Sequence, residues 1–197
     1  MPQNAANFLR SGFLRPRAVA RYLIDLKFSN DSIIQAALLG SVLSALTWAI
    51  LPLVFEKYHL QLPVNKQLPL FMDLGLGLAA IFLTSHIVML LARSIGVQIG
   101  FRASITIYIW FGILESCLML CLMALVYVVG PLAVILFIPA GFWGIWALGC
   151  YWSELLQRPG FFTGLALIIV ASLISSAILL GVVGVFDQSI PELATNV

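Results

Sequence analysis

The chain has 197 residues, of which 62% are hydrophobic and only 9% are charged. Soluble domains carry roughly 25% charged residues, and a chain of this length folded in water could not bury so much apolar surface. The composition therefore excludes ordinary soluble enzymes, nucleic-acid binders and disordered proteins, and the net charge of +2 does not alter this. We predict an all-α, polytopic membrane protein.

The first predicted element is a short amphipathic helix from Pro16 to Lys27. Its apolar side chains Val19, Leu23 and Leu26 recur at helical spacing, and charged residues share a different face. Such a helix lies at the surface of one leaflet, where each cation gains about 1 kcal/mol against anionic headgroups. We assign this contact with lipid to Arg15, Arg17, Arg21 and Lys27. Docking of a partner protein is the alternative role for this helix.

Five continuous apolar runs follow, each long enough to cross a bilayer. A span needs about 20 residues, and helices satisfy their own backbone hydrogen bonds in lipid. Pro52 and Pro139 lie within two of the runs and predict kinks. The runs extend from Ser32 to Phe55, Pro69 to Leu91, Ile105 to Val129, Pro131 to Leu156 and Phe161 to Phe186. They predict a five-helix bundle preceded by the amphipathic helix.

Basic residues are unequally distributed between the two sides of this topology. With the N-terminus inside, the outer side carries only Lys57 and Lys66. The inner side carries eight basic residues: Arg10, Arg15, Arg17, Arg21, Lys27, Arg93, Arg102 and Arg158. Because positive loops stay in the cytoplasm, we predict a cytoplasmic segment over residues 1–31, a membrane domain over 32–186 and a tail outside the cytoplasm over 187–197.

The connection between the second and third spans carries a recognisable pattern. The stretch from His86 to Ser104 reads HIVMLLARSIGVQIGFRAS, in which Gly96 and Gly100 bound a loop and Phe101-Arg102 opens the next span. This pattern resembles the matching connection of the Yip-domain family, the Ypt/Rab-interacting membrane proteins.

Two further segments resemble the same family. Leu14-Arg15-Pro16 is similar to its proline-led amphipathic entry, and the stretch from Gly144 to Thr163 is similar to its last interhelical connection. The resemblance covers nearly the whole chain and implies five spans with a cytoplasmic N-terminus. Residues 1–31 form a shorter cytoplasmic region than in eukaryotic members. This argues against Rab binding and implies a bacterial-type member in the inner membrane.

Glu115 is the acidic residue that lies deepest in a predicted span. A charge near the bilayer centre costs several kcal/mol unless it is neutralised or paired. A protonated carboxyl bonded to Ser116, to a backbone carbonyl or to a serine of another helix is one explanation. The others are a bond to a partner helix and proton or ion transport. His86 on the preceding span is the natural partner, although its depth differs by about one helical turn.

Two interpretations concern the predicted cytoplasmic ends of the spans. Glu154 and Arg158 are spaced for an ion pair on one helix face, worth a few tenths of a kcal/mol. Alternatively, a patch formed by Arg93, Arg102, Glu154 and Arg158 docks a cytoplasmic partner.

Small residues recur every four positions in several spans and predict close helix packing. They include Ala37, Ser41, Ala45 and Ala49, then Gly75 and Ala79, Ala140 and Gly144, Ser172 and Ser176, and Ala177 and Gly181. Trp143 and Trp146 lie mid-span, where packing inside the bundle is the expected role.

Motifs for nucleotide binding or nucleophilic catalysis are not found in the sequence, and the two histidines are too far apart to build a metal site by spacing. We therefore expect no enzymatic activity, no cofactor and no nucleic-acid partner. The leading expectation is a Yip-like protein that binds membrane lipids or other integral membrane proteins and organises or shapes the bilayer. An accessory subunit or assembly factor of a larger complex and a small proton- or ion-coupled transporter using Glu115 are the alternatives. Homo-oligomer formation stays open.

Overall fold

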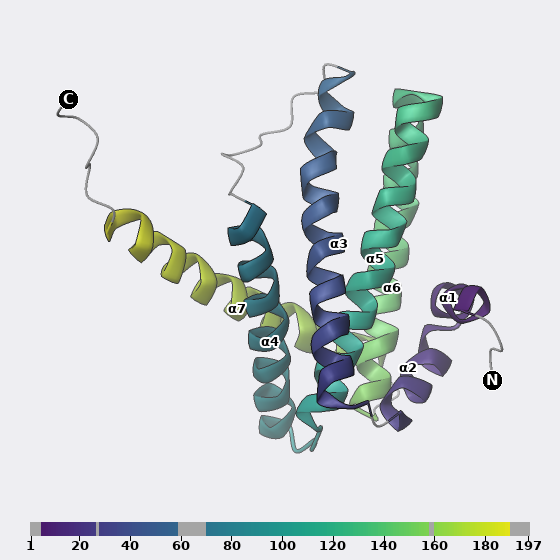
Figure 1. Cartoon of the computed structure of the whole chain (residues 1–197). Coiled ribbons are helices and arrows are strands. Elements are labelled where there is room, and N and C mark those ends of the chain that lie inside the picture. Colours follow the sequence, from purple (N-terminus) through teal and green to yellow (C-terminus); the bar gives the residue numbers. More distant parts are fainter. Residues whose placement is uncertain (1–4, 27, 59–69, 158–159, 190–197) are drawn as a thin grey trace.

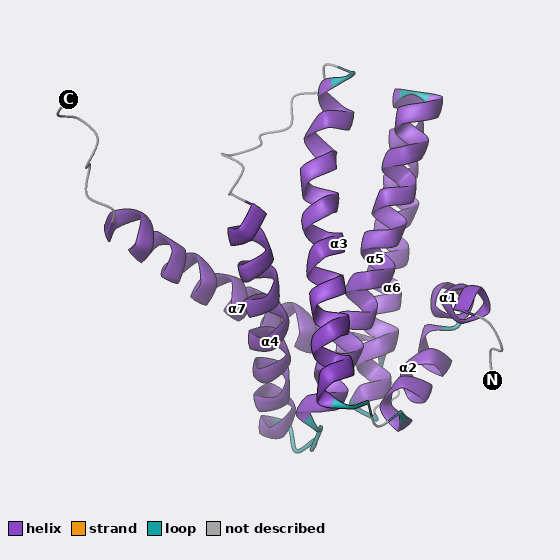
Figure 2. Ribbon diagram, in the orientation of Figure 1, coloured by secondary structure: helices purple, strands orange, loops and turns teal. Residues whose placement is uncertain are grey.

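The computed structural model describes residues 5–26, 28–58, 70–157 and 160–189 (Figure 1). Within these ranges the chain consists of helices joined by turns and has no strand, which confirms the predicted all-α class (Figure 2). Five stretches in this part of the chain are long and apolar enough to cross a membrane. They lie in α3 (Asn30–Glu56), α4 (Leu70–Ser94), α5 (Phe101–Val129), η1 (Pro131–Leu136) with α6 (Phe137–Leu155), and α7 (Phe161–Ser189). The protein is therefore an integral, multi-pass membrane protein.

The N-terminal segment forms two helices where the sequence predicts one. α2 (Pro16–Asp25) matches the predicted element, and Pro16 occupies its first turn, where the missing N–H breaks no helical hydrogen bond. α1 (Ala5–Leu14) is an additional helix that lies beside the bundle (Figure 1). We call α1 and α2 together the N-terminal pair.

The helix ends follow from local chemistry. The Ser29 hydroxyl caps α3 by accepting a hydrogen bond of 3.2 Å from the backbone N–H three residues later. α4 ends in a Schellman turn, in which the Gly96 N–H donates to the Arg93 carbonyl at 3.0 Å and the Val97 N–H donates to the Ala92 carbonyl at 2.9 Å. Gly96 has a φ of +78°, which a residue with a Cβ rarely adopts. This turn sets the short α4–α5 connection.

The fourth span begins differently from the prediction. It opens with the 3₁₀ helix η1, and α6 starts only at Phe137. Pro139 therefore lies in the first turn of α6, where proline breaks no helical hydrogen bond. In place of the kink predicted at Pro139, the fourth span changes from 3₁₀ to α geometry just before this residue. Pro52, the other proline predicted to lie within a span, does lie inside α3.

The largest buried cluster lies at the end of the bundle where α4 joins α5. It combines side chains of α2, α4, α5, α6 and α7, and Tyr151 and Trp152 are fully buried within it. α7 contributes Ile168 to the cluster and then runs obliquely away from the other helices (Figure 1). Leu173 and Leu180, further along α7, are exposed. The helices thus converge at the end that also carries the N-terminal pair.

Candidate functional site

The N-terminal pair packs against α5 and α6 on one flank of the bundle. Val19, Ala20 and Leu23 of α2 are buried in the main cluster. Leu26, the third predicted apolar residue of this helix, is 36% exposed. The apolar face that the sequence assigns to the lipid surface is therefore directed mainly at protein.

The carboxyl end of α1 is held by side chains from the spanning helices. The last carbonyls of any helix lack partners within the helix and need other donors when water is excluded. The Trp143 indole N–H donates to the Phe13 carbonyl at 3.0 Å. The Tyr151 hydroxyl donates to the Gly12 carbonyl at 3.3 Å and accepts from the Trp110 indole at 3.0 Å. These bonds supply two carbonyls of the last α1 turn with partners.

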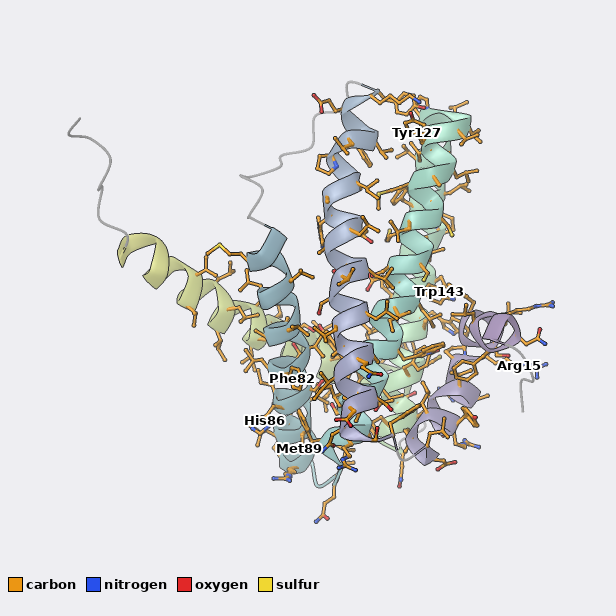
Figure 3. All side chains as sticks on the ribbon, viewed as in Figure 1. Arg15, Phe82, His86, Met89, Tyr127 and Trp143 are labelled. Carbon is orange, nitrogen blue, oxygen red and sulfur yellow. The ribbon has the colours of Figure 1, made fainter. Side chains whose placement is uncertain are left out.

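Aromatic packing reinforces these hydrogen bonds. The ring centroids of Phe13 and Trp143 are 4.8 Å apart, and those of Phe8 and Trp110 are 4.7 Å apart. Figure 3 shows Trp143 on the side of the bundle that carries the N-terminal pair. We call Trp110, Trp143 and Tyr151 the α1 seat. Packing inside the bundle was the role predicted for Trp143 and Trp146. Trp143 does pack there, with the N-terminal pair as part of the contact, whereas Trp146 is 44% exposed and the prediction is wrong for it.

The sequence prediction missed Tyr151 and Trp110 as holders of α1. A tyrosine hydroxyl within an apolar run needs a hydrogen-bond partner, and this need was the available signal. The sequence could not show that the partner would be a main-chain carbonyl of residue 12.

The α1 seat fixes the depth of α1 along the bundle. Trp110 lies nine positions from the start of α5, hence about 14 Å from its end. α5 has 29 residues, about 43 Å, which matches a bilayer with its headgroups. About 7 Å of that length belongs to headgroups at either end. In a bilayer matched to α5 in this way, Trp110 would lie about 7 Å on the acyl-chain side of the headgroup boundary, within the depth of about 5–10 Å typical of interfacial amphipathic helices.

Arg21 ties α2 to the end of α6. Its Nε and one terminal nitrogen both lie 2.8 Å from Oε1 of Glu154. The arginine side chain is 72% exposed, so the pair contributes at most about 1 kcal/mol. Glu154 was predicted to pair with Arg158, which lies outside the described residues, and Arg21 was predicted to face lipid. The structure adds a role for Arg21 that the sequence did not predict, because Arg21 holds Glu154, and the predicted pair of Glu154 with Arg158 stays a prediction.

The remaining predicted lipid contacts divide into two cases. Arg15 and Arg17 are exposed on the N-terminal pair, and Figure 3 shows Arg15 on the outer side of the pair. Lys27 lies outside the described residues. Arg15 and Arg17 are therefore free to reach headgroups.

The predicted docking patch is present only in part. Arg93 and Arg102 are exposed at the two ends of the α4–α5 connection, on the same end of the bundle as Glu154. Glu154 is engaged by Arg21, and Arg158 is not described. The structure thus leaves Arg93 and Arg102 as the accessible basic residues of the predicted patch.

Glu115 lies fourteen positions from either end of α5 and borders a cavity of about 450 Å³. All five spanning helices line this cavity, which we call the Glu115 cavity. Its wall is mostly apolar or small, with hydroxyl-bearing side chains from Ser41, Ser44, Tyr108, Ser116 and Ser172. Among the described residues, no hydrogen bond or ion pair joins Glu115 to another side chain. The predicted bond to a neighbouring serine is not formed.

His86 is not placed with Glu115. Its side chain is exposed on α4 and its ring packs edge-on against Phe101, with centroids 6.2 Å apart. His86 does not line the Glu115 cavity. The sequence predicts that His86 and Glu115 differ in depth by about one helical turn, and the helix packing does not bring them together. The two residues therefore do not form a relay.

No protein-family model, no curated protein and no solved structure matches this chain. Across the described ranges, no cluster of three or more His, Cys, Asp or Glu residues could hold a metal ion. The structure itself offers two candidate features: the N-terminal pair on its seat and the mostly apolar Glu115 cavity inside the membrane domain.

Proposed function

We propose that the protein is a non-enzymatic, Yip-like membrane protein that organises or shapes the bilayer through its N-terminal pair. The observation that carries this proposal is the pair of hydrogen bonds by which Trp143 and Tyr151 hold the end of α1 against the spanning helices, part of the way along them. A helix at that level occupies area in one leaflet and not in the other. Rigid attachment to the bundle makes the inserted area a fixed property of the molecule.

The charge of the pair supports the same role. Arg10, Arg15 and Arg17 are exposed, whereas the apolar face of α2 is buried against α6. Each basic residue near an anionic membrane surface contributes about 1 kcal/mol to binding. The pair thus combines inserted area with a preference for anionic lipid, the two requirements for shaping a leaflet of that composition.

The orientation proposed for this protein places the N-terminal pair in the cytoplasmic leaflet of a bacterial inner membrane. Arg21, Arg93 and Arg102 share one end of the bundle. Lys57 lies at the other end, where its Nζ donates to the Tyr127 carbonyl at 3.1 Å. The positive-inside rule then places the first end in the cytoplasm.

A topology test has an all-or-none expected result. A reporter enzyme that is active only outside the cytoplasm should be active when fused after Val197 and inactive when inserted at Gln98, in the exposed α4–α5 connection. Enzyme activity in cells, normalised to the amount of fusion protein, measures both. Activity at Gln98 together with inactivity after Val197 would contradict the proposed orientation.

The shaping role is tested by removing charge from the pair. In vesicles rich in anionic lipid, the wild type should produce smaller or tubular vesicles, seen by cryo-electron microscopy. The double variant Arg15→Gln/Arg17→Gln keeps α1 on its seat but loses charge, so it should reshape these vesicles clearly less than the wild type does. Loss of two cations corresponds to about 2 kcal/mol, or a roughly 30-fold weaker preference for anionic over zwitterionic lipid.

The matched control is Arg93→Gln/Arg102→Gln, which removes the same charge from the same end of the bundle but not from the pair. It should reshape vesicles as the wild type does. Equal loss of reshaping in both double variants would show that only total charge matters and would contradict a specific role of the pair. A wild type that leaves vesicles unchanged would refute the shaping role.

A further inference from the structure

The Glu115 cavity has the features of a ligand site, and it shares one lining residue, Trp143, with the α1 seat. Small-molecule sites are mostly apolar, have volumes of about 300–1,000 Å³ and contain a few convergent polar groups. The Glu115 cavity has a volume of about 450 Å³ and gathers one carboxyl and several hydroxyls in a mostly apolar wall. Its position near the middle of α5 limits the ligand to molecules that dissolve in lipid.

Ser41 provides a second indication that this cavity holds a ligand. Its side chain lines the cavity and is 2% exposed, yet its Oγ has no hydrogen-bond partner among the described residues. Leaving a buried hydroxyl without a partner costs about 1–3 kcal/mol. The Oγ has almost no accessible surface as it lies, so a bound molecule with a polar head would supply that partner once the Ser41 side chain rotates toward the cavity.

Glu115 determines the chemistry of the head. A carboxyl in the membrane centre needs a donor or a counter-charge, and within the described chain no basic side chain pairs with it. An ammonium group donates to several acceptors and neutralises a carboxylate, and charge-assisted bonds are the strongest hydrogen bonds available. The glycines around Glu115 leave room for such a ligand, since a Cβ added at Gly112 would meet no atom within 4 Å.

We propose that the Glu115 cavity binds a lipid-soluble amine, with its ammonium group between Glu115 and Ser41 and its apolar body against the small residues. The binding site goes beyond the shaping role and does not depend on it. Binding of a neutral lipid-soluble alcohol and the absence of any specific ligand are the competing outcomes.

The test compares dodecylamine, dodecanol and dodecane as probes on the purified, full-length protein in detergent, with thermal stabilisation during titration as the readout. The wild type should bind the amine at least about tenfold more tightly than the alcohol, because the charged bond to Glu115 is lost with the alcohol. Glu115→Gln should abolish that preference. The alkane should not bind measurably.

Two further variants keep the test decisive if the glutamine variant fails to fold. Gly112→Leu fills the cavity without removing the carboxyl, so it should stay folded and lose the amine. Glu56→Gln removes a carboxyl from the exposed end of α3 and should bind the amine as the wild type does. An alcohol that binds as tightly as the amine, unchanged amine binding in Glu115→Gln or Gly112→Leu, or no binding to the wild type would each overturn the proposal.

Discussion

Gly164→Ala is expected to destabilise the protein by about 3 kcal/mol, the upper part of the range for an overpacked core. Gly164 is buried where α7 crosses α6. A Cβ there would lie 2.9 Å from both the Ser153 Cα and the Trp152 carbonyl carbon. These are main-chain atoms of a helix, so they cannot rotate away as a side chain would. α7 would have to move off α6, and the main cluster would lose Ile168.

The measurement is reversible unfolding in mixed micelles with increasing denaturing detergent. Gly181→Ala is the matched control, because Gly181 lies on the same helix and a Cβ there would meet no atom within 4 Å. Its free energy of unfolding should stay within about 0.5 kcal/mol of the wild-type value. Equal destabilisation by both substitutions would show that glycine is needed in α7 for a reason other than contact with α6.

The small residues illustrate what the sequence could and could not predict. Rows of small residues predicted close helix packing, and Ala37 and Ser41 are indeed buried. Gly75 and Gly144, members of the predicted rows, would carry a Cβ without meeting any atom. The tight crossing occurs at Gly164, outside every predicted row. Spacing alone does not give the rotation and tilt of a helix, and these decide which row meets a neighbour.

The number of spans was predictable for a different reason. An apolar run of span length has one stable form in lipid, whatever its neighbours do, so composition and length are sufficient. Composition and length are not sufficient to predict the N-terminal pair. α2 has a periodic apolar face, whereas α1 contains Gly12 and owes its position to contacts with α5 and α6. A helix of ten residues is marginal alone, and its partners are distant in sequence.

For the candidate sites, too, the sequence predicted the position of a residue along its helix better than its partner in space. The structure does place Glu115 at the middle of α5, with its side chain exposed on the chain, and the cost of a charge there follows from its position along the span alone. The predicted contact with His86 is not formed, and the predicted partner of Glu154, Arg158, lies outside the described residues. Which side chain reaches Glu154 depends on how α2 docks, and an amphipathic pattern gives the face of a helix but not its neighbour.

Trp143→Phe/Tyr151→Phe is expected to release α1 from the bundle. The two substitutions remove the donors to the carbonyls of Phe13 and Gly12 while keeping an aromatic ring at both positions. Each unpaired carbonyl costs about 1–3 kcal/mol where water is scarce, so the local opening free energy of α1 should fall by about 2–6 kcal/mol. Backbone amides over residues 5–14 should then exchange hydrogen at least about 30-fold faster, by mass spectrometry in nanodiscs.

Trp146→Phe is the control for this release, because the Trp146 side chain is 44% exposed on the same helix. It should leave exchange over residues 5–14 unchanged. The double seat variant also separates the two parts of the proposed mechanism: it retains Arg15 and Arg17 but no longer fixes α1 at its depth. If depth generates the shaping activity, this variant should bind anionic lipid normally yet leave vesicles large. Full reshaping activity with a released α1 would mean that charge alone acts. It would contradict the proposal that insertion of α1 at a fixed depth shapes the bilayer.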